Sequence, residues 1–241
     1  MSRHRKNNEI NRILSVYNKY MAHSRSKNKW SISNKGNRII YNERKSNISK
    51  IIHDLDIRLT SKNILDVGCA GGNIFNLLQD LGAKEENIYG IDVRGDRLDD
   101  AKELFPASNF MQMDARELNF DDATFDIVFT FTIFSSIIEK KIRMEVANEI
   151  CRVLRPNGVI IYYDIRYNNP FNSNVIKMTL DDIKYLFPNM IVKLKPVTIL
   201  PPLIRALGKI SIQLYPLLAK LNFLKTHYIG HFTKANYQKF I

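Results

Sequence analysis

The sequence contains little cysteine and no long apolar stretch. Its 241 residues include two cysteines, Cys69 and Cys151, which are too few for a disulfide framework and lack the paired spacing of a zinc site. No segment approaches the roughly 18 uninterrupted apolar residues of a membrane-spanning helix. The basic N-terminus is not followed by an apolar run, so no secretory signal is indicated. We therefore expect a cytoplasmic protein, kept reduced and without a metal centre.

Two phosphate-binding motifs are also missing. The chain has no GxxxxGK[ST] sequence, so a P-loop is not indicated. A dinucleotide fingerprint GxGxxG beginning at Gly68 would require glycine at two positions that hold Ala70 and Asn73. The composition is otherwise that of a globular protein, with 45% hydrophobic and 25% charged residues.

The net charge of +12 is unevenly distributed along the chain. Residues 1–50 contain 13 Lys and Arg against 2 acidic residues, and residues 190–241 contain 8 against none. The intervening segment, 51–189, contains 15 against 22. Positive chain ends favour an anionic partner, such as RNA, an acidic membrane surface or an acidic substrate. The alternative, a lysine-rich surface without a binding role, stays open on composition alone.

Short apolar runs alternate with helical patterns between residues 63 and 165. The runs predict strands at 63–67, 88–92, 109–114, 125–134 and 159–165, and the helical patterns predict helices at 73–81, 95–105 and 139–154. This alternation is typical of βαβ units, which build a parallel sheet covered by helices on both faces. We therefore expect an α/β, doubly wound fold.

The flanking segments predict additions to this unit. Helices at 8–22 and 42–58 would make residues 1–60 an N-terminal helical cap in the same domain as residues 61–241. After residue 165, we expect a helix at 180–187, a strand at 191–199, a helix over 202–219 and a last strand at 226–234. Pro196 favours an edge position for the strand that contains it. The segment at about 200–224 is then a helical insertion.

The most informative stretch is ILDVGCAGGNIF, residues 64–75. A buried strand ends, glycines follow at once and a helix begins, which allows close backbone approach to a ligand. Asp92 ends the next strand, where an acid binds a ribose diol in nucleotide-binding βαβ units. Asp66 would repel a pyrophosphate but suits a cationic ligand. S-adenosylmethionine (SAM) carries an ammonium and a sulfonium group and no phosphate.

Five sequence blocks resemble, in order, those of class I SAM-dependent methyltransferases. They are DVGCAGG (66–72), YGIDV (89–93), MQMDARELNF (111–120), FDIVFTFTIF (125–134) and VLRPNGVIIYYD (153–164). The resemblance implies a Rossmann-like, mostly parallel seven-stranded sheet whose last strand is antiparallel. It also implies SAM as the cofactor and S-adenosylhomocysteine as its product. Ala70 stands where the family most often has glycine.

The resemblance further implies a cofactor role for residues at the ends of the first four strands: Asp66, Gly68, Cys69, Ala70, Gly71, Gly72, Asp92, Val93, Asp114, Ala115, Thr130 and Phe131. Asp66 and the glycine loop would line the methionine moiety. Asp92 would hold the ribose hydroxyls and Val93 would pack on adenine. Asp114, with the Ala115 backbone beside it, would accept from the adenine amino group. Thr130 and Phe131 would face the cofactor.

Asp164 is the candidate general base. It ends the fifth strand at the carboxyl edge, where open α/β sheets bind ligands, and a base is needed when the acceptor loses a proton during attack. The alternative role for Asp164 is to cap the loop that follows, and the sequence does not separate the two roles.

The acceptor is less well defined. The tail of the chain is similar to methyltransferase-domain proteins linked to bacterial glycan biosynthesis, which favours a small-molecule or glycan acceptor, acidic in character and methylated on oxygen. DNA is not expected. The alternatives are an RNA methyltransferase, for which no aromatic-rich RNA-binding module is visible, and a SAM-binding scaffold without catalysis. Residues 202–224 would form a lid over the acceptor or a helix at an anionic membrane surface, on the inner face of the membrane.

Overall fold

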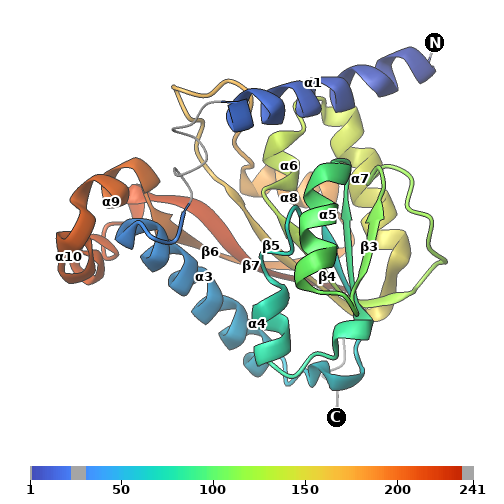
Figure 1. Cartoon of the computed structure of the whole chain (residues 1–241), viewed down its shortest axis with the longest axis horizontal. Coiled ribbons are helices and arrows are strands. Elements are labelled where there is room, and N and C mark those ends of the chain that lie inside the picture. The colour runs from blue at the N-terminus through green and yellow to red at the C-terminus, as the bar shows by residue number, and fades with distance from the viewer. Residues whose placement is uncertain (1, 23–30, 235–241) are drawn as a thin grey trace.

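The computed structural model describes residues 2–22 and 31–234 (Figure 1). Within them, a seven-stranded sheet has the order β3-β2-β1-β4-β5-β7-β6. The strands are β1 (Ile64–Val67), β2 (Ile88–Asp92), β3 (Asn109–Gln112), β4 (Phe125–Phe131), β5 (Leu154–Ile165), β6 (Met190–Ile199) and β7 (Lys225–Lys234). Strand β7 pairs antiparallel with β5 and β6, and the remaining pairs are parallel. The expected fold class is confirmed.

Helices cover both faces of this sheet. They are α1 (Ser2–Ala22), α3 (Lys35–Asp54), α4 (Phe75–Asp80), α5 (Gly95–Leu104), α6 (Ile133–Ser136), α7 (Lys140–Val153), α8 (Leu180–Leu186), α9 (Pro201–Leu207) and α10 (Ser211–Leu218). Apolar residues of α3, α4 and α5 form one core cluster, and those of α6, α7 and α8 form the other. We call these two sides the α3 face and the α7 face.

The central strands are apolar because both of their faces are covered. Ile64 of β1 and Ile127 of β4 point to the α3 face, whereas Leu65 and Val128 point to the α7 face. All four side chains are fully buried. A strand buried on both sides reads as a continuous apolar run, which is why β1 and β4 could be recognised in the sequence.

The strand expected at 125–134 ends earlier than predicted. Strand β4 stops at Phe131, Thr132 adopts a left-handed conformation with φ of 55°, and α6 begins at Ile133. The Thr132 N–H donates to the Tyr163 carbonyl at 2.7 Å, and Ser136 Oγ donates to the Thr132 carbonyl. The apolar run continues past the turn because Phe134 enters the core of the α7 face.

The helix expected over 202–219 is interrupted. Gly208 has φ of 53° and begins a short 3₁₀ turn, which divides the segment into α9 and α10. Helix α9 packs against α3, where a Cβ at Gly36 would overlap the Ile204 carbonyl. Strand β6 lies at one edge of the sheet, which confirms the edge position expected from Pro196.

The N-terminal helices also differ from the expected ranges. Helix α3 begins at Lys35, before the expected 42–58, because the Asn34 side chain caps it by accepting from the Gly36 and Asn37 N–H groups. The polar connection that precedes it includes residues 23–30, which lie outside the described residues. Helix α1 lies beside α6, where Arg12 donates to the Ser136 carbonyl (Figure 1).

None of the helices in the described ranges is long and apolar enough to cross a membrane.

Candidate cofactor and acceptor site

The loop after β1 has the backbone geometry that its glycines suggest. Gly68, Ala70 and Gly72 have φ values of 72°, 48° and 73°, which are left-handed conformations. The N–H groups of Gly68 and Cys69 donate to the Ile91 carbonyl at 2.7 and 3.0 Å. A Cβ at Gly68 would displace the end of the Ile133 side chain, and the left-handed conformation itself favours glycine at this position. The loop is thereby fixed to the carboxyl end of β2.

Asp92 links this loop to the turn after β2. Its carboxylate accepts from the Ala70 N–H at 3.0 Å and from the Arg94 N–H at 2.9 Å. Burial raises the pKa of Asp92 above its ordinary value, and the hydrogen bonds from Arg94 and Ala70 act in the opposite direction. The neighbouring Val93 is half-buried, and its carbonyl accepts from Gln112.

Asp66 is a buried carboxylate without a hydrogen-bond donor among the described residues. Its exposed fraction is 3%. Burial first, and then the charge of Asp92, raise the pKa of Asp66 to about 8, while the Arg44 charge lowers it. An ionised carboxylate that is buried without a hydrogen-bond donor costs folding free energy unless a positive charge binds to it. Cys69 beside it is buried, and burial raises the pKa of its thiol, so the sulfur is an uncharged packing group.

Asp114 follows β3 and is held by its own turn. The carboxylate accepts from the Arg116 N–H at 3.0 Å and from Arg116 Nε at 2.7 Å. These bonds hold Asp114 within its own turn, and the Asp114 side chain keeps an exposed fraction of 31%. Ala115 is half-buried against the α7 face.

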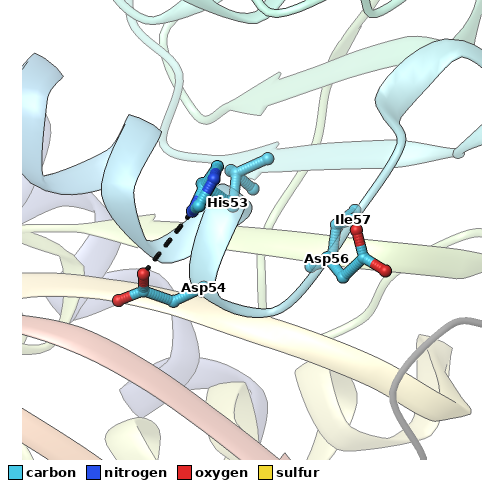
Figure 2. A pocket seen from close by; sticks show the side chains of 5 residues that line it. His53, Asp54, Asp56 and Ile57 are labelled. Atoms are coloured by element: carbon cyan, nitrogen blue, oxygen red, sulfur yellow. Dashed lines mark ion pairs between the residues drawn. The ribbon is translucent and has the colours of Figure 1, made fainter.

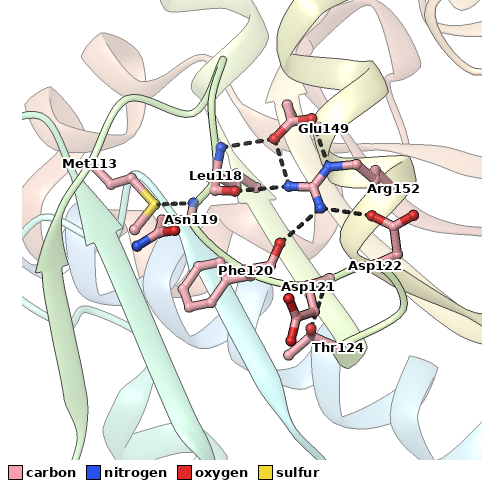
Figure 3. Close-up of polar contacts among 9 residues, drawn as sticks. All are labelled: Met113, Leu118, Asn119, Phe120, Asp121, Asp122, Thr124, Glu149 and Arg152. Carbon is pink, nitrogen blue, oxygen red and sulfur yellow. Dashed lines mark hydrogen bonds and ion pairs between the residues drawn. The ribbon is translucent and has the colours of Figure 1, made fainter.

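Arg152 of α7 holds the rest of the segment that connects β3 to β4. It donates to the Leu118 and Phe120 carbonyls at 2.8 and 2.7 Å and pairs with Glu149 and Asp122 (Figure 3). Glu149 in turn accepts from the Leu118 N–H. This network fixes the segment that leads from Asp114 to β4.

Thr130 and Phe131 end β4 on opposite faces of the sheet. Thr130 points to the α7 face, is fully buried, and has no hydrogen-bond partner for its hydroxyl within the described ranges. Phe131 points to the α3 face and remains half-buried. Of the two residues, Phe131 therefore shares the face of Asp66.

Asp164 is fully buried on the α7 face. Its two carboxylate oxygens accept from the Ser135 N–H at 3.1 Å and the Ile165 N–H at 2.8 Å. Burial raises the pKa of Asp164 to about 6, against the lowering effect of Ser135 and the backbone N–H groups. These contacts favour the capping alternative, and the catalytic role stays a prediction.

A second group of side chains lies on the α3 face, where Phe131 meets three residues that the sequence did not connect with it. The Arg44 guanidinium of α3 stands 5.5 Å from the ring centres of both Phe131 and Tyr163. His227 of β7 stacks on Tyr163, with ring centres 4.8 Å apart and planes 8° apart. We call Arg44, Phe131, Tyr163 and His227 the aromatic cluster. No local motif marks it, because α3 and β7 are distant in the sequence.

A hollow elsewhere on the surface has no such chemistry. It lies at the end of α3 and at the start of the connection to β1 (Figure 2). The residues that line it are Ile52, His53, Asp54, Asp56 and Ile57. His53 is 90% exposed and lies 3.7 Å from Asp54. The hollow therefore adjoins the amino end of β1, opposite the glycine loop.

The fold and the glycine loop together define a Rossmann-like methyltransferase fold. Residues 65–162 match the model of the methyltransferase domain family. A SAM-dependent methyltransferase from Methanosarcina mazei has a similar structure, with a TM-score of 0.58 and 17% identity over 76% of this chain and 96% of that chain. At that identity, the likeness concerns the fold.

Two curated relatives are similar in sequence over the same region. A probable phthiotriol/phenolphthiotriol dimycocerosates methyltransferase 2 from Mycobacterium ulcerans is 31% identical over 45% of this chain and 41% of that protein. A ubiquinone/menaquinone biosynthesis C-methyltransferase from Campylobacter jejuni is 29% identical over 41% of this chain and 42% of that protein. The chain thus spans less than half the length of these relatives. Residues 65–162 are thus similar to the methyltransferase domain family, and the expected resemblance is confirmed.

Proposed function

We propose that this chain transfers the methyl group of SAM to a small-molecule acceptor. The observation that carries the proposal is Asp66, a buried carboxylate without a hydrogen-bond donor among the described residues, beside a left-handed glycine loop. SAM would supply a methyl group already activated by its sulfonium. An acid without a cation partner, next to a loop without the dinucleotide glycines, suits the ammonium of SAM better than a pyrophosphate.

The proposed roles follow from the positions of the residues. Asp66 and the loop from Gly68 to Gly72 bind the methionine end, and Asp92 binds the ribose hydroxyls. Val93 packs on adenine, and Asp114 with the Ala115 backbone accepts from its amino group. Phe131 borders the methyl-transfer region from the α3 face, and Thr130 supports the end of β4 from the α7 face. Because the sulfonium methyl is activated, the main task of these residues is to align cofactor and acceptor.

The acceptor proposed is a small molecule methylated on oxygen. The two curated relatives are named for phthiotriol-type dimycocerosates and for ubiquinone and menaquinone biosynthesis, which supports a small-molecule acceptor. An acidic acceptor, including an acidic glycan, agrees with the positive charge of residues 1–50 and 190–241. An RNA acceptor and a scaffold without catalysis are the other outcomes that the experiment below separates.

We further propose that α9 and α10 form a lid rather than a membrane anchor. Ile204 is fully buried where α9 packs on α3, the helix that carries Arg44. The outer side of the segment exposes Ile210, Ile212 and Leu217 near Lys209 and Lys220, which would suit peripheral contact with an anionic membrane. Sedimentation with anionic liposomes separates the two roles. Salt-sensitive sedimentation that is lost in an Ile212→Ser, Leu217→Ser variant would contradict the lid.

The function is tested by methyl transfer from labelled SAM into an extract of the cells that make the protein. The extract is divided into RNase-treated, protease-treated, small-molecule and lipid fractions. We expect the label in a small-molecule or lipid fraction, in a product whose methyl group is attached to oxygen. Loss of label on RNase treatment would establish an RNA acceptor, and SAM binding without any transfer would indicate a scaffold.

A further inference from the structure

The aromatic cluster holds a cation without an acidic partner. No carboxylate of the described residues lies within 4.0 Å of the Arg44 guanidinium, although it is surrounded by the rings of Tyr41, Phe131 and Tyr163. Arg44 and Phe131 are each half-buried, so both keep part of their surface open. A guanidinium held by ring faces retains its N–H donors for an anionic oxygen, which it binds with directional hydrogen bonds.

His227 presents a hydrogen-bond acceptor at the other end of the cluster. Thr226 Oγ1 donates to the Thr198 carbonyl at 3.1 Å, so its proton is already used. The same oxygen lies 2.9 Å from His227 Nδ1, and Nδ1 must therefore carry the proton and donate to it. This assigns the lone pair to Nε2. Burial and the nearby Arg44 charge lower the pKa of His227 to about 3, which keeps the ring neutral.

A hydrogen-bond network through Thr198 holds Tyr163 and the part of α3 that carries Arg44 in place. Tyr163 Oη lies 3.0 Å from Thr198 Oγ1, which donates to Glu43 Oε2, and the Thr198 N–H donates to the same oxygen at 2.8 Å. Thr198 has φ of 60°, a conformation that a β-branched residue adopts only when its surroundings enforce it. Since Glu43 precedes Arg44 on α3, this network anchors the position of Arg44 relative to Tyr163 and His227.

The cluster adjoins the proposed methyl-transfer region. Phe131 ends β4, next to β1, which carries Asp66, and the Arg44 charge acts on the pKa of both Asp66 and His227. Arg44 is therefore near enough to both Asp66 and His227 for its charge to act on each of them.

We propose that Arg44 and His227 form the acceptor-recognition site, which takes a planar small molecule bearing an ionised oxygen acid and a hydroxyl donor. Arg44 binds the anionic oxygen, the half-buried Phe131 ring contacts the planar body, and His227 Nε2 accepts from the hydroxyl. This inference rests on the proposed function and deepens it, because it names the chemical class of the acceptor.

The test uses calorimetry on the full chain loaded with S-adenosylhomocysteine. The probes are para-hydroxybenzoate, para-hydroxybenzamide, which lacks the anion, and para-methoxybenzoate, which lacks the donor. We expect wild type to bind para-hydroxybenzoate roughly tenfold or more tightly than either analogue. Arg44→Gln should abolish the preference over the amide, and His227→Phe should abolish the preference over the methoxy compound.

Matched controls come from the same elements. Arg38→Gln changes an exposed arginine of α3, and His231→Gln changes a histidine on the same face of β7, so both should bind all three probes as wild type does. Arg44→Lys keeps the charge but not the planar fork, and it should retain part of the preference for the anion. It also serves as the second variant if Arg44→Gln does not fold.

Three outcomes would overturn this inference. They are absence of para-hydroxybenzoate binding to the loaded wild type, unchanged selectivity in folded Arg44 and His227 variants, and an Arg44→Gln variant that loses cofactor affinity while keeping probe selectivity. Failure of wild type to bind SAM would instead contradict the proposed function, so the two failures are distinguishable.

Discussion

The carboxylate of Asp92 accepts a hydrogen bond from the backbone N–H of Ala70 at 3.0 Å, which ties the end of β2 to the glycine loop after β1. The same carboxylate accepts from the Arg94 N–H. Asp92 thus sets the position of the loop, and we propose that it also binds the ribose diol of the cofactor.

Asp92→Ala should weaken SAM binding. Loss of a hydrogen bond to a buried partner costs about 1–3 kcal/mol, which raises the dissociation constant roughly tenfold to hundredfold. Calorimetric titration with SAM measures the effect, and Asp99→Ala, an exposed change on α5, is the control. Equal affinity in wild type and Asp92→Ala would remove Asp92 from the site.

Asp66 should make the stability of the free protein depend on pH. Its folded-state pKa of about 8 lies above the ordinary value of 3.8, so the folded chain binds more protons than the unfolded chain between these values. Stability should therefore fall as pH rises from about 4 to about 8. Asp66→Asn removes this contribution, and its melting temperature at pH 8 should exceed that of wild type. Parallel pH profiles of the two proteins would contradict this pKa.

Asp164→Asn separates the catalytic role from the capping role. The amide oxygen can replace only part of the two hydrogen bonds from Ser135 and Ile165, so the free energy of unfolding should fall by about 1–3 kcal/mol. If capping is the role, kcat at 20 °C should fall less than roughly tenfold, since general-base catalysis typically contributes 10²–10⁴. A larger loss of kcat in a folded variant, with unchanged SAM affinity, would establish Asp164 as the base.

Arg152→Ala should destabilise the connection between β3 and β4. The change removes donors to the Leu118 and Phe120 carbonyls and leaves Glu149 without its ion-pair partner. We expect the free energy of unfolding in urea to fall by about 1–3 kcal/mol. Arg152→Lys should recover only part of this loss, because lysine cannot reproduce the planar guanidinium contacts. Full stability in Arg152→Ala would show that the network contributes little.

The sequence predicted the sheet well where apolar runs have clear polar or glycine boundaries. Strand β2 was expected at 88–92 and spans Ile88–Asp92, because a charged turn follows it directly. The end of β4 was missed because Phe134, which lies beyond the turn in α6, is as apolar as the strand and is buried in the core of the α7 face. In such cases, composition does not reveal which element buries a residue.

The candidate site also has one part that could be predicted from the sequence and another part that could not. The glycine loop and Asp92 follow consecutive strands, so their positions could be predicted from the order of the elements. Arg44 and His227 both contact Tyr163 only because α3 packs across the sheet near β7. No periodicity in either segment encodes that contact.

A crystal structure of the complex with S-adenosylhomocysteine tests the central claim most directly. We predict ribose hydroxyls within hydrogen-bond distance of the Asp92 carboxylate, the amino group of the ligand at Asp66, and its sulfur directed towards Phe131. Density for the ligand away from the loop at Gly68–Gly72, or a ribose that leaves Asp92 without contact, would contradict the account.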